Sequence, residues 1–136
     1  MPLMSSVDAT GVAVQVSMSA LGAAGVWLPP SLGPGQVPYY DRLNAGRLID
    51  KIRALSFSDQ AGTLFVEDAD NPAGAWTTLN GGGAGTVAAA GALADSAWNI
   101  PTKRYWRVRY LNGAVAQTSF ELWVATGAGQ PDVHTL

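Results

Sequence analysis

Alternating apolar and polar positions are clearest between Lys103 and Val124, where two runs flank the dipeptide Asn112-Gly113. A period of two predicts strands with one buried face. Asn-Gly tolerates positive φ at both central positions of a tight turn, so it favours an antiparallel connection. We therefore predict a β-hairpin over 103–124. The predicted inner faces read Arg104, Trp106, Val108 and Tyr110 before the dipeptide, and Thr118, Phe120, Leu122 and Val124 after it.

Shorter runs predict further strands along the chain. The run 48–57 fits both the helical and the strand period in part, and we favour a strand because a turn-like segment and an apolar alternation follow it. Short strands separated by turn signals are typical of an all-β fold, an antiparallel β-sandwich of jelly-roll-like or Ig-like type. The remaining segments are read as strands at 12–18 and 62–67, a turn at 68–75, a short strand at 76–79, a flexible loop at 80–85, and a thin strand or a helix at 86–94.

Prolines and glycines set the N-terminal part of the chain apart. Pro29, Pro30, Pro34 and Pro38 exclude a central strand and favour extended backbone. Apolar residues spaced along this segment suit an arm that lies on a surface, either the domain's own core or a neighbouring protein. We therefore divide the chain into an N-terminal strand and extended arm, a β-sandwich core, and a tail that needs a partner to become ordered. Their ranges are 1–45, 46–125 and 126–136.

Composition narrows the class of protein. Hydrophobic residues make up 48% of the 136 residues, whereas charged residues make up only 13%, about half the usual share of roughly 25%. Part of the surface must therefore be apolar or covered by neighbours. A net charge of −2 argues against a general binder of nucleic acid or of membrane surfaces. The lack of cysteine excludes disulfides and thiolate metal sites, and we expect neither a signal peptide nor a membrane-spanning helix.

Histidine and carboxylate patterns give little support for a metal site. His134, the single histidine, lies in a glycine- and proline-rich tail that seldom positions a catalytic group. Glu67, Asp68 and Asp70 resemble a calcium loop loosely, but the spacing and the closing glutamate of an EF-hand are missing. A solvated turn is the simpler interpretation of these carboxylates.

No pattern indicates a reaction. The glycine-rich segment 80–85 lacks the Lys-Ser/Thr that completes a phosphate-binding loop. A glycosidase would need two carboxylates about 5–10 Å apart, and nothing selects a pair from Asp59, Glu67 and Glu121. We expect a protein that is not an enzyme and that uses no catalytic residues, metal or cofactor.

One cluster of charge can be interpreted in two ways. Lys103, Arg107 and Arg109 share a face with Tyr105. Such a face suits an anionic or aromatic partner, because guanidinium pairs with carboxylates and stacks on rings. We favour the other interpretation, an arginine ladder of the kind common on exposed sheet faces, with Glu67, Glu121 or Asp50 on neighbouring strands as partners.

Two blocks of sequence stand in a recognisable order. The first block runs from Phe57 to Asp68 (FSDQAGTLFVED), Trp76 follows, and the second runs from Arg107 to Leu122 (RVRYLNGAVAQTSFEL). Together they resemble small β-sandwich virion proteins of tailed bacteriophages. The resemblance covers about 48–124 and implies that each block forms a hairpin. These are structural patterns with no attached active site.

The resemblance implies a structural component that decorates or cements the capsid exterior as a homo-oligomer, made in the host cytoplasm and located on the virion. Its partners would be the major capsid protein or other virion proteins, without nucleic acid or membrane. A carbohydrate- or receptor-binding module of a head or tail fibre, bound to host-surface glycan, is the alternative, and a hydrolase is a third. Residues predicted to contact a partner are Trp27, Tyr39, Tyr40, Arg107, Arg109 and Trp123.

Overall fold

The computed structural model describes residues 14–17, 19–28, 40–44 and 47–128. Within these ranges the strands form two antiparallel sheets, which confirms the predicted all-β sandwich. The five-stranded sheet contains β1 (Val14–Ser17), β11 (Phe120–Ala128), β5 (Arg47–Ser58), β4 (Leu43–Asn44) and β9 (Ala92–Asp95). The six-stranded sheet contains β2 (Val26–Trp27), β10 (Tyr105–Asn112), β6 (Gly62–Ala69), β7 (Thr77–Thr78), β3 (Tyr40–Asp41) and β8 (Thr86–Ala88).

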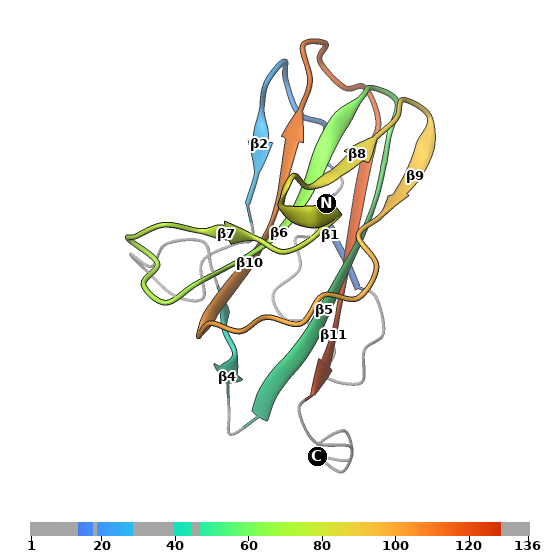
Figure 1. The fold of residues 1–136 in the computed structure, drawn as a ribbon. Helices are drawn as coiled ribbons and strands as arrows, with labels where there is room; N and C mark the ends of the chain where they lie inside the picture. The colour runs from blue at the N-terminus through green and yellow to red at the C-terminus, as the bar shows by residue number, and fades with distance from the viewer. Residues whose placement is uncertain (1–13, 18, 29–39, 45–46, 129–136) are drawn as a thin grey trace.

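Each sheet is built on one pair of long antiparallel strands with short strands beside it (Figure 1). In the five-stranded sheet β5 pairs with β11, and in the six-stranded sheet β6 pairs with β10 from Gly62↔Asn112 to Ala69↔Tyr105. Two short strands lie beside each of β5 and β6. β4 and β9 pair with opposite ends of β5, and β7 and β8 pair with opposite ends of β6. Short edge strands leave few unpaired backbone groups open to another chain.

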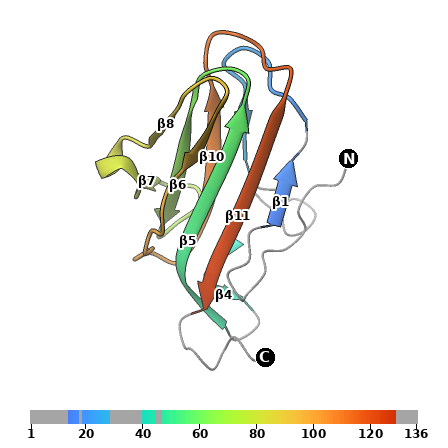
Figure 2. The same ribbon diagram turned by 90° about the vertical axis from the view of Figure 1, so that its right-hand side faces the viewer.

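The two sheets lie face to face (Figure 2). The core lies between them and follows the alternation of the four long strands. Trp106, predicted to face the core, is buried in it. The rings of Tyr110 and Phe120, on opposite sheets, meet with their centroids 4.9 Å apart. The other side chains that the long strands contribute to this core cluster are Ile52, Ala54, Leu64, Val66, Val108, Leu122 and Val124.

The predicted hairpin over 103–124 is wrong, although both of its strands exist. β10 pairs with β6 and β11 pairs with β5, so the chain crosses from one sheet to the other between Asn112 and Phe120. Asn112 is a buried strand residue whose amide nitrogen donates to the carbonyls of Gly22 and Val115 at 2.8 Å, and Gly113 has no positive φ. The Asn-Gly dipeptide therefore ends a strand instead of forming a tight turn. Alternation does not distinguish two strands of a hairpin from two strands that face each other across a core.

The hairpin expected from the first resemblance block is wrong for the same reason, because β5 and β6 also lie in different sheets. The two crossing loops are fastened to each other. The Asp59 carboxylate accepts hydrogen bonds from the backbone N–H groups of Thr118 and Ser119 at 3.0 and 3.1 Å. Gly113 N–H donates to the Ala61 carbonyl at 3.0 Å. The end of the sandwich is thus closed by two linked loops.

The glycine-rich segment 80–85 contains a 3₁₀ turn (Gly81–Gly83) anchored by the buried Asn80 side chain. Gly81, Gly82 and Gly83 all have positive φ, which glycine adopts without strain. The segment 86–94, which the sequence left open between strand and helix, forms β8 and β9 on different sheets.

The N-terminal part of the chain contributes strands to both sheets. β1 pairs with β11, and β2 and β3 pair with β10. The prolines at 29–38 and the tail after 128 lie outside the described residues, so the predicted three-part division of the chain remains a prediction. In the described part of the chain, no helix has the length and apolar character needed to cross a membrane.

Candidate functional site

The outer surface of the six-stranded sheet carries a cluster that we call the arginine–aromatic face: Phe65, Glu67, Trp76, Arg107 and Arg109. Strand alternation directs Arg107 and Arg109 of β10 away from the core, since Trp106, Val108 and Tyr110 point into it. The register then places Arg107 opposite Glu67 and Arg109 opposite Phe65. Trp76 lies immediately before β7.

Both arginines converge on one carboxylate. Arg107 Nε donates to Glu67 Oε1 at 2.7 Å, and Arg109 donates through Nε to Oε1 at 3.2 Å and through Nη2 to Oε2 at 3.0 Å. Thr78 Oγ1 adds a hydrogen bond to Oε2 at 3.3 Å. The Glu67 side chain is only 4% exposed, whereas those of Arg107 and Arg109 are 20% and 23% exposed. Glu67 is therefore a buried carboxylate that pairs with two partly exposed arginines.

An aromatic ring stacks on each guanidinium. Arg107 Cζ lies 4.2 Å from the centroid of the Trp76 ring, and Arg109 Cζ lies 4.0 Å from that of Phe65. Trp76 is held in turn, because its indole N–H donates to the Pro72 carbonyl at 3.2 Å. Hydrogen bonds to Glu67 and contact with an aromatic ring together restrain both guanidinium groups.

The electrostatics of the cluster favour an ionised Glu67. Burial disfavours the charged carboxylate, but hydrogen bonds from Arg109 and Arg107 and their positive charge outweigh it and lower the pKa of Glu67. The two arginines carry two positive charges against one negative charge, so the cluster keeps a net charge of +1.

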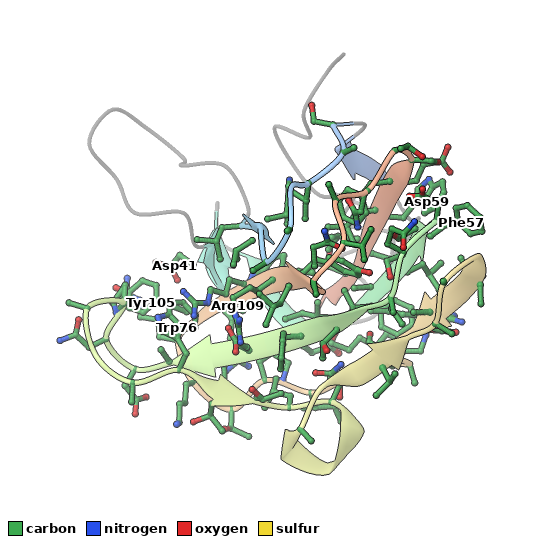
Figure 3. All side chains as sticks on the ribbon, turned by 90° about the horizontal axis from the view of Figure 1, so that it is seen from above. Asp41, Phe57, Asp59, Trp76, Tyr105 and Arg109 are labelled. Carbon is green, nitrogen blue, oxygen red and sulfur yellow. The ribbon has the colours of Figure 1, made fainter. Side chains whose placement is uncertain are left out.

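The structure shows Arg107 and Arg109 paired with Glu67 on the neighbouring strand, which is one of the two interpretations drawn from the sequence. Lys103 does not join this cluster, since its Nζ donates to Thr77 Oγ1 at 2.7 Å. Tyr105 lies on the same strand, and Figure 3 shows Tyr105, Trp76 and Arg109 on the left of the view and Phe57 and Asp59 on the right.

The other predicted contact residues are distributed over the molecule. Trp27 is buried in the core, so this part of the arm lies on its own domain. The backbone of Tyr40 forms β3, and Tyr39 lies outside the described residues. Trp123 is half-buried on the outer surface of the five-stranded sheet, opposite Leu55.

Trp123 belongs to an apolar patch on that outer surface, formed by Leu55, Phe57, Leu93 and Trp123. The register places Phe57 beside Leu93 of β9, and Leu55 beside Trp123 of β11. Leu93 is 62% exposed. Leu55, Phe57 and Trp123 are half-buried beside it. Contiguous apolar side chains that remain accessible on an outer sheet surface are typical of contact surfaces.

The carboxylates considered for a calcium site or a glycosidase point in different directions. Glu67 binds the arginines outside the six-stranded sheet, while Asp68 points inward and accepts hydrogen bonds from the N–H groups of Thr102 and Lys103 at 2.9 and 3.2 Å. Asp59 belongs to the crossing loops. No group of three His, Cys, Asp or Glu within the described ranges is placed to hold a metal ion, and His134 lies outside them.

Trp76 and Phe65 belong to the arginine–aromatic face, but neither residue was predicted from the sequence to be part of a site. Phe65 and Glu67 are two positions apart in the run 62–67, so they share one face of the predicted strand. This pattern could have placed Phe65 next to an arginine that pairs with Glu67. Trp76 carries no such signal, because its position depends on how the turn after β6 folds back.

The fold and this surface define the chain as an antiparallel β-sandwich domain with an arginine–aromatic outer face. The chain belongs to the family described as "Uncharacterised protein YqxG N-terminal domain", whose model matches residues 39–127. It is 39% identical over 87 residues to the uncharacterized protein YqxG of Bacillus subtilis (strain 168), covering 64% of this chain and 28% of that protein.

A second relative belongs to a phage-like element. The chain is 43% identical over 94 residues to the phage-like element PBSX protein XepA of Bacillus subtilis (strain 168), covering 69% of this chain and 32% of that protein. It also superimposes on the crystal structure of PBSX exported protein XepA with a TM-score of 0.75 and 35% identity, covering 93% of this chain and 40% of that one. The chain thus spans about a third of the length of these curated relatives. The resemblance to phage proteins is confirmed at this coarser level.

Proposed function

We propose that this chain is a non-enzymatic structural domain of a phage or phage-like particle, where it decorates or cements the capsid exterior through subunit contacts. The homology to a protein of a phage-like element supports the setting. The observation that carries the contact role is the apolar patch, which offers Leu55, Phe57, Leu93 and Trp123 on the outside of the five-stranded sheet. Many copies on a lattice turn modest contacts into firm attachment.

Leu93→Glu tests this role with little risk to the fold, because Leu93 is 62% exposed. Val87→Glu is the matched control: Val87 is 81% exposed, lies on a short edge strand, and faces outward on the opposite sheet. Deleting the N-terminal arm would be a poorer test, since β1 and β2 belong to the two sheets.

The measurement is the number of copies per particle, by quantitative mass spectrometry of particles purified from the host that encodes the chain. Wild-type and Val87→Glu chains are expected in fixed stoichiometry with the heads, and Leu93→Glu is expected to be depleted from them. Equal occupancy for both variants would refute the role of the patch. Recovery of the wild-type chain only as free protein in the medium would refute the decorating function itself.

A second candidate function is the recognition of a carbohydrate or receptor on the host. One specific observation favours it: Trp76 and the two arginines form an oriented, partly exposed surface of the kind that binds polar ligands. Binding of the isolated chain to a glycan array, with loss of binding in Trp76→Ala, is the expected result for this candidate. An array without any bound glycan would argue against it.

A further inference from the structure

The arginine–aromatic face differs from the other arginine pairs in its ratio of charges. Arg53 pairs with Asp95, and Arg104 pairs with Asp41, each as one cation with one carboxylate. At Glu67 two guanidinium groups share one carboxylate. One positive charge is therefore left over at a place where the arginines are mostly shielded from water, which makes an added anion favourable.

The arginines also have unused donors. Arg107 uses Nε for Glu67, and Arg109 uses Nε and Nη2. Within the described part of the chain, no hydrogen bond is formed by Arg107 Nη1, Arg107 Nη2 or Arg109 Nη1. A guanidinium presents its N–H groups as a planar fork that matches the oxygens of carboxylate or phosphate.

The arrangement is preorganised. Trp76 and Phe65 stack on the guanidinium planes, the Glu67 carboxylate holds their inner edges, and Pro72 holds the Trp76 indole. Long side chains that are already fixed lose little entropy when a ligand binds. Trp76 is only half-buried, so part of this residue remains accessible to solvent.

The geometry points to an oxyanion-binding site formed by Arg107, Arg109 and Trp76, for a carboxylate or phosphate group carried on a sugar or polyol. The guanidinium groups bind the oxyanion, and the exposed part of the indole contacts the sugar or polyol carbons. This site lies on the outer surface of the six-stranded sheet, whereas the apolar patch lies on the five-stranded sheet. The proposal of an anion site therefore does not depend on the proposed capsid decoration. Glu67 acts in it as a resident anion that orients the arginines and offsets half of their charge.

The test is an NMR titration of the full 136-residue chain in a low-salt buffer without phosphate. The observed signals are the arginine Nε–H and tryptophan indole N–H resonances. The probes are glycerol 3-phosphate, glucuronate and the neutral methyl glucoside, so that phosphate, carboxylate and sugar contributions are separated. Saturable shifts at Arg107, Arg109 and Trp76 are expected with one or both anions and not with the neutral sugar.

Three variants make the test specific. Arg107→Gln is expected to weaken anion binding by about tenfold or more, because a charge-assisted hydrogen bond is lost. Arg53→Gln removes the same charge from the outside of the other sheet, next to Asp95, and is expected to bind like the wild type. Glu67→Gln keeps the size of the side chain and removes the competing anion, so it is expected to bind about threefold tighter or more.

The gain of affinity in Glu67→Gln separates a binding site from a merely structural ion-pair cluster, which would only lose stability. Binding of either anion alone identifies the source of the oxyanion and supports the site. The site is refuted if neither anion shifts these resonances, if the neutral sugar shifts them equally, or if Arg107→Gln and Arg53→Gln bind alike.

Discussion

Asn80 offers the sharpest test of how the six-stranded sheet is held together. β7 ends at Thr78 and β8 begins at Thr86, so the middle of β6 has no neighbouring strand on this side. Asn80 fills the gap: its Oδ1 accepts from Val66 N–H at 2.9 Å, and its Nδ2 donates to the Leu64 carbonyl at 2.8 Å. The side-chain amide thus replaces a peptide group of the missing strand.

Asn80→Ala would remove the hydrogen bonds that its side chain makes with two buried backbone groups, the Val66 N–H and the Leu64 carbonyl. Asn80 is 2% exposed, so water reaches the site poorly. Each buried donor or acceptor left unsatisfied costs about 1–3 kcal/mol, and two of them give a loss of about 2–6 kcal/mol in the free energy of unfolding. Urea denaturation at 25 °C measures this loss, and hydrogen exchange should show faster exchange at the Val66 amide.

Two further variants control the result. Asn71→Ala removes an exposed side chain that bonds only the N–H of Ala73 in a turn, and its cost should stay within about 1 kcal/mol. Asn80→Asp keeps the acceptor for Val66 but turns a second oxygen toward the Leu64 carbonyl. That repulsion and burial raise the folded-state pKa of the new carboxyl, so the destabilisation should shrink as pH falls from about 7 to about 5. An Asn80→Ala chain as stable as Asn71→Ala, with normal protection of Val66, would refute the reasoning.

Three other predictions concern the closed end of the sandwich. Hydrogen bonds from Thr118 and Ser119 lower the pKa of Asp59 from 3.8 to about 2. The stability that they contribute is therefore present above pH 3.8 and is lost as pH falls toward 2. Acid denaturation of the Asp59→Asn variant should lack this loss. Gly62→Ala should lower the free energy of unfolding by about 1–3 kcal/mol, measured by thermal or urea unfolding, because the new Cβ would lie 2.7 Å from Tyr110 Cζ. Gly22→Ala is the control, since a Cβ there would meet no atom within 4 Å. Burial raises the pKa of Tyr110 above 10.0, so stability should fall as pH rises past 10, and Tyr110→Phe should remove that part of the fall.

The alternation of apolar residues predicted the long strands well but could not predict their partners. Trp106, Val108 and Tyr110 were placed on the inner face correctly, because period two depends only on the local pleat. Whether the next strand pairs beside them or faces them across the core is set by contacts far apart in sequence, such as Gly113 N–H on the Ala61 carbonyl. That is why both expected hairpins are wrong although the predicted antiparallel sandwich is confirmed.

The candidate site was predictable to the same limited extent. A shared face for Arg107 and Arg109 follows from the sequence, and Glu67 was among the carboxylates considered as partners. The two-to-one pairing with Glu67 needs the register of β6 against β10, and the Trp76 stack needs the turn that carries it back over Arg107. Both depend on tertiary structure that no local pattern encodes.

The crossing loops also determine how the two proposals relate to each other. Because β5→β6 and β10→β11 both pass between sheets, the arginine–aromatic face and the apolar patch lie on opposite outer surfaces of one sandwich. A domain attached to a particle through the patch would therefore present the arginines outward, away from the lattice. Arg107→Gln should then leave the number of copies per particle unchanged, and Leu93→Glu should leave anion binding unchanged. Loss of both properties in either variant would mean that one surface serves both roles, and the separation of attachment from recognition would fail.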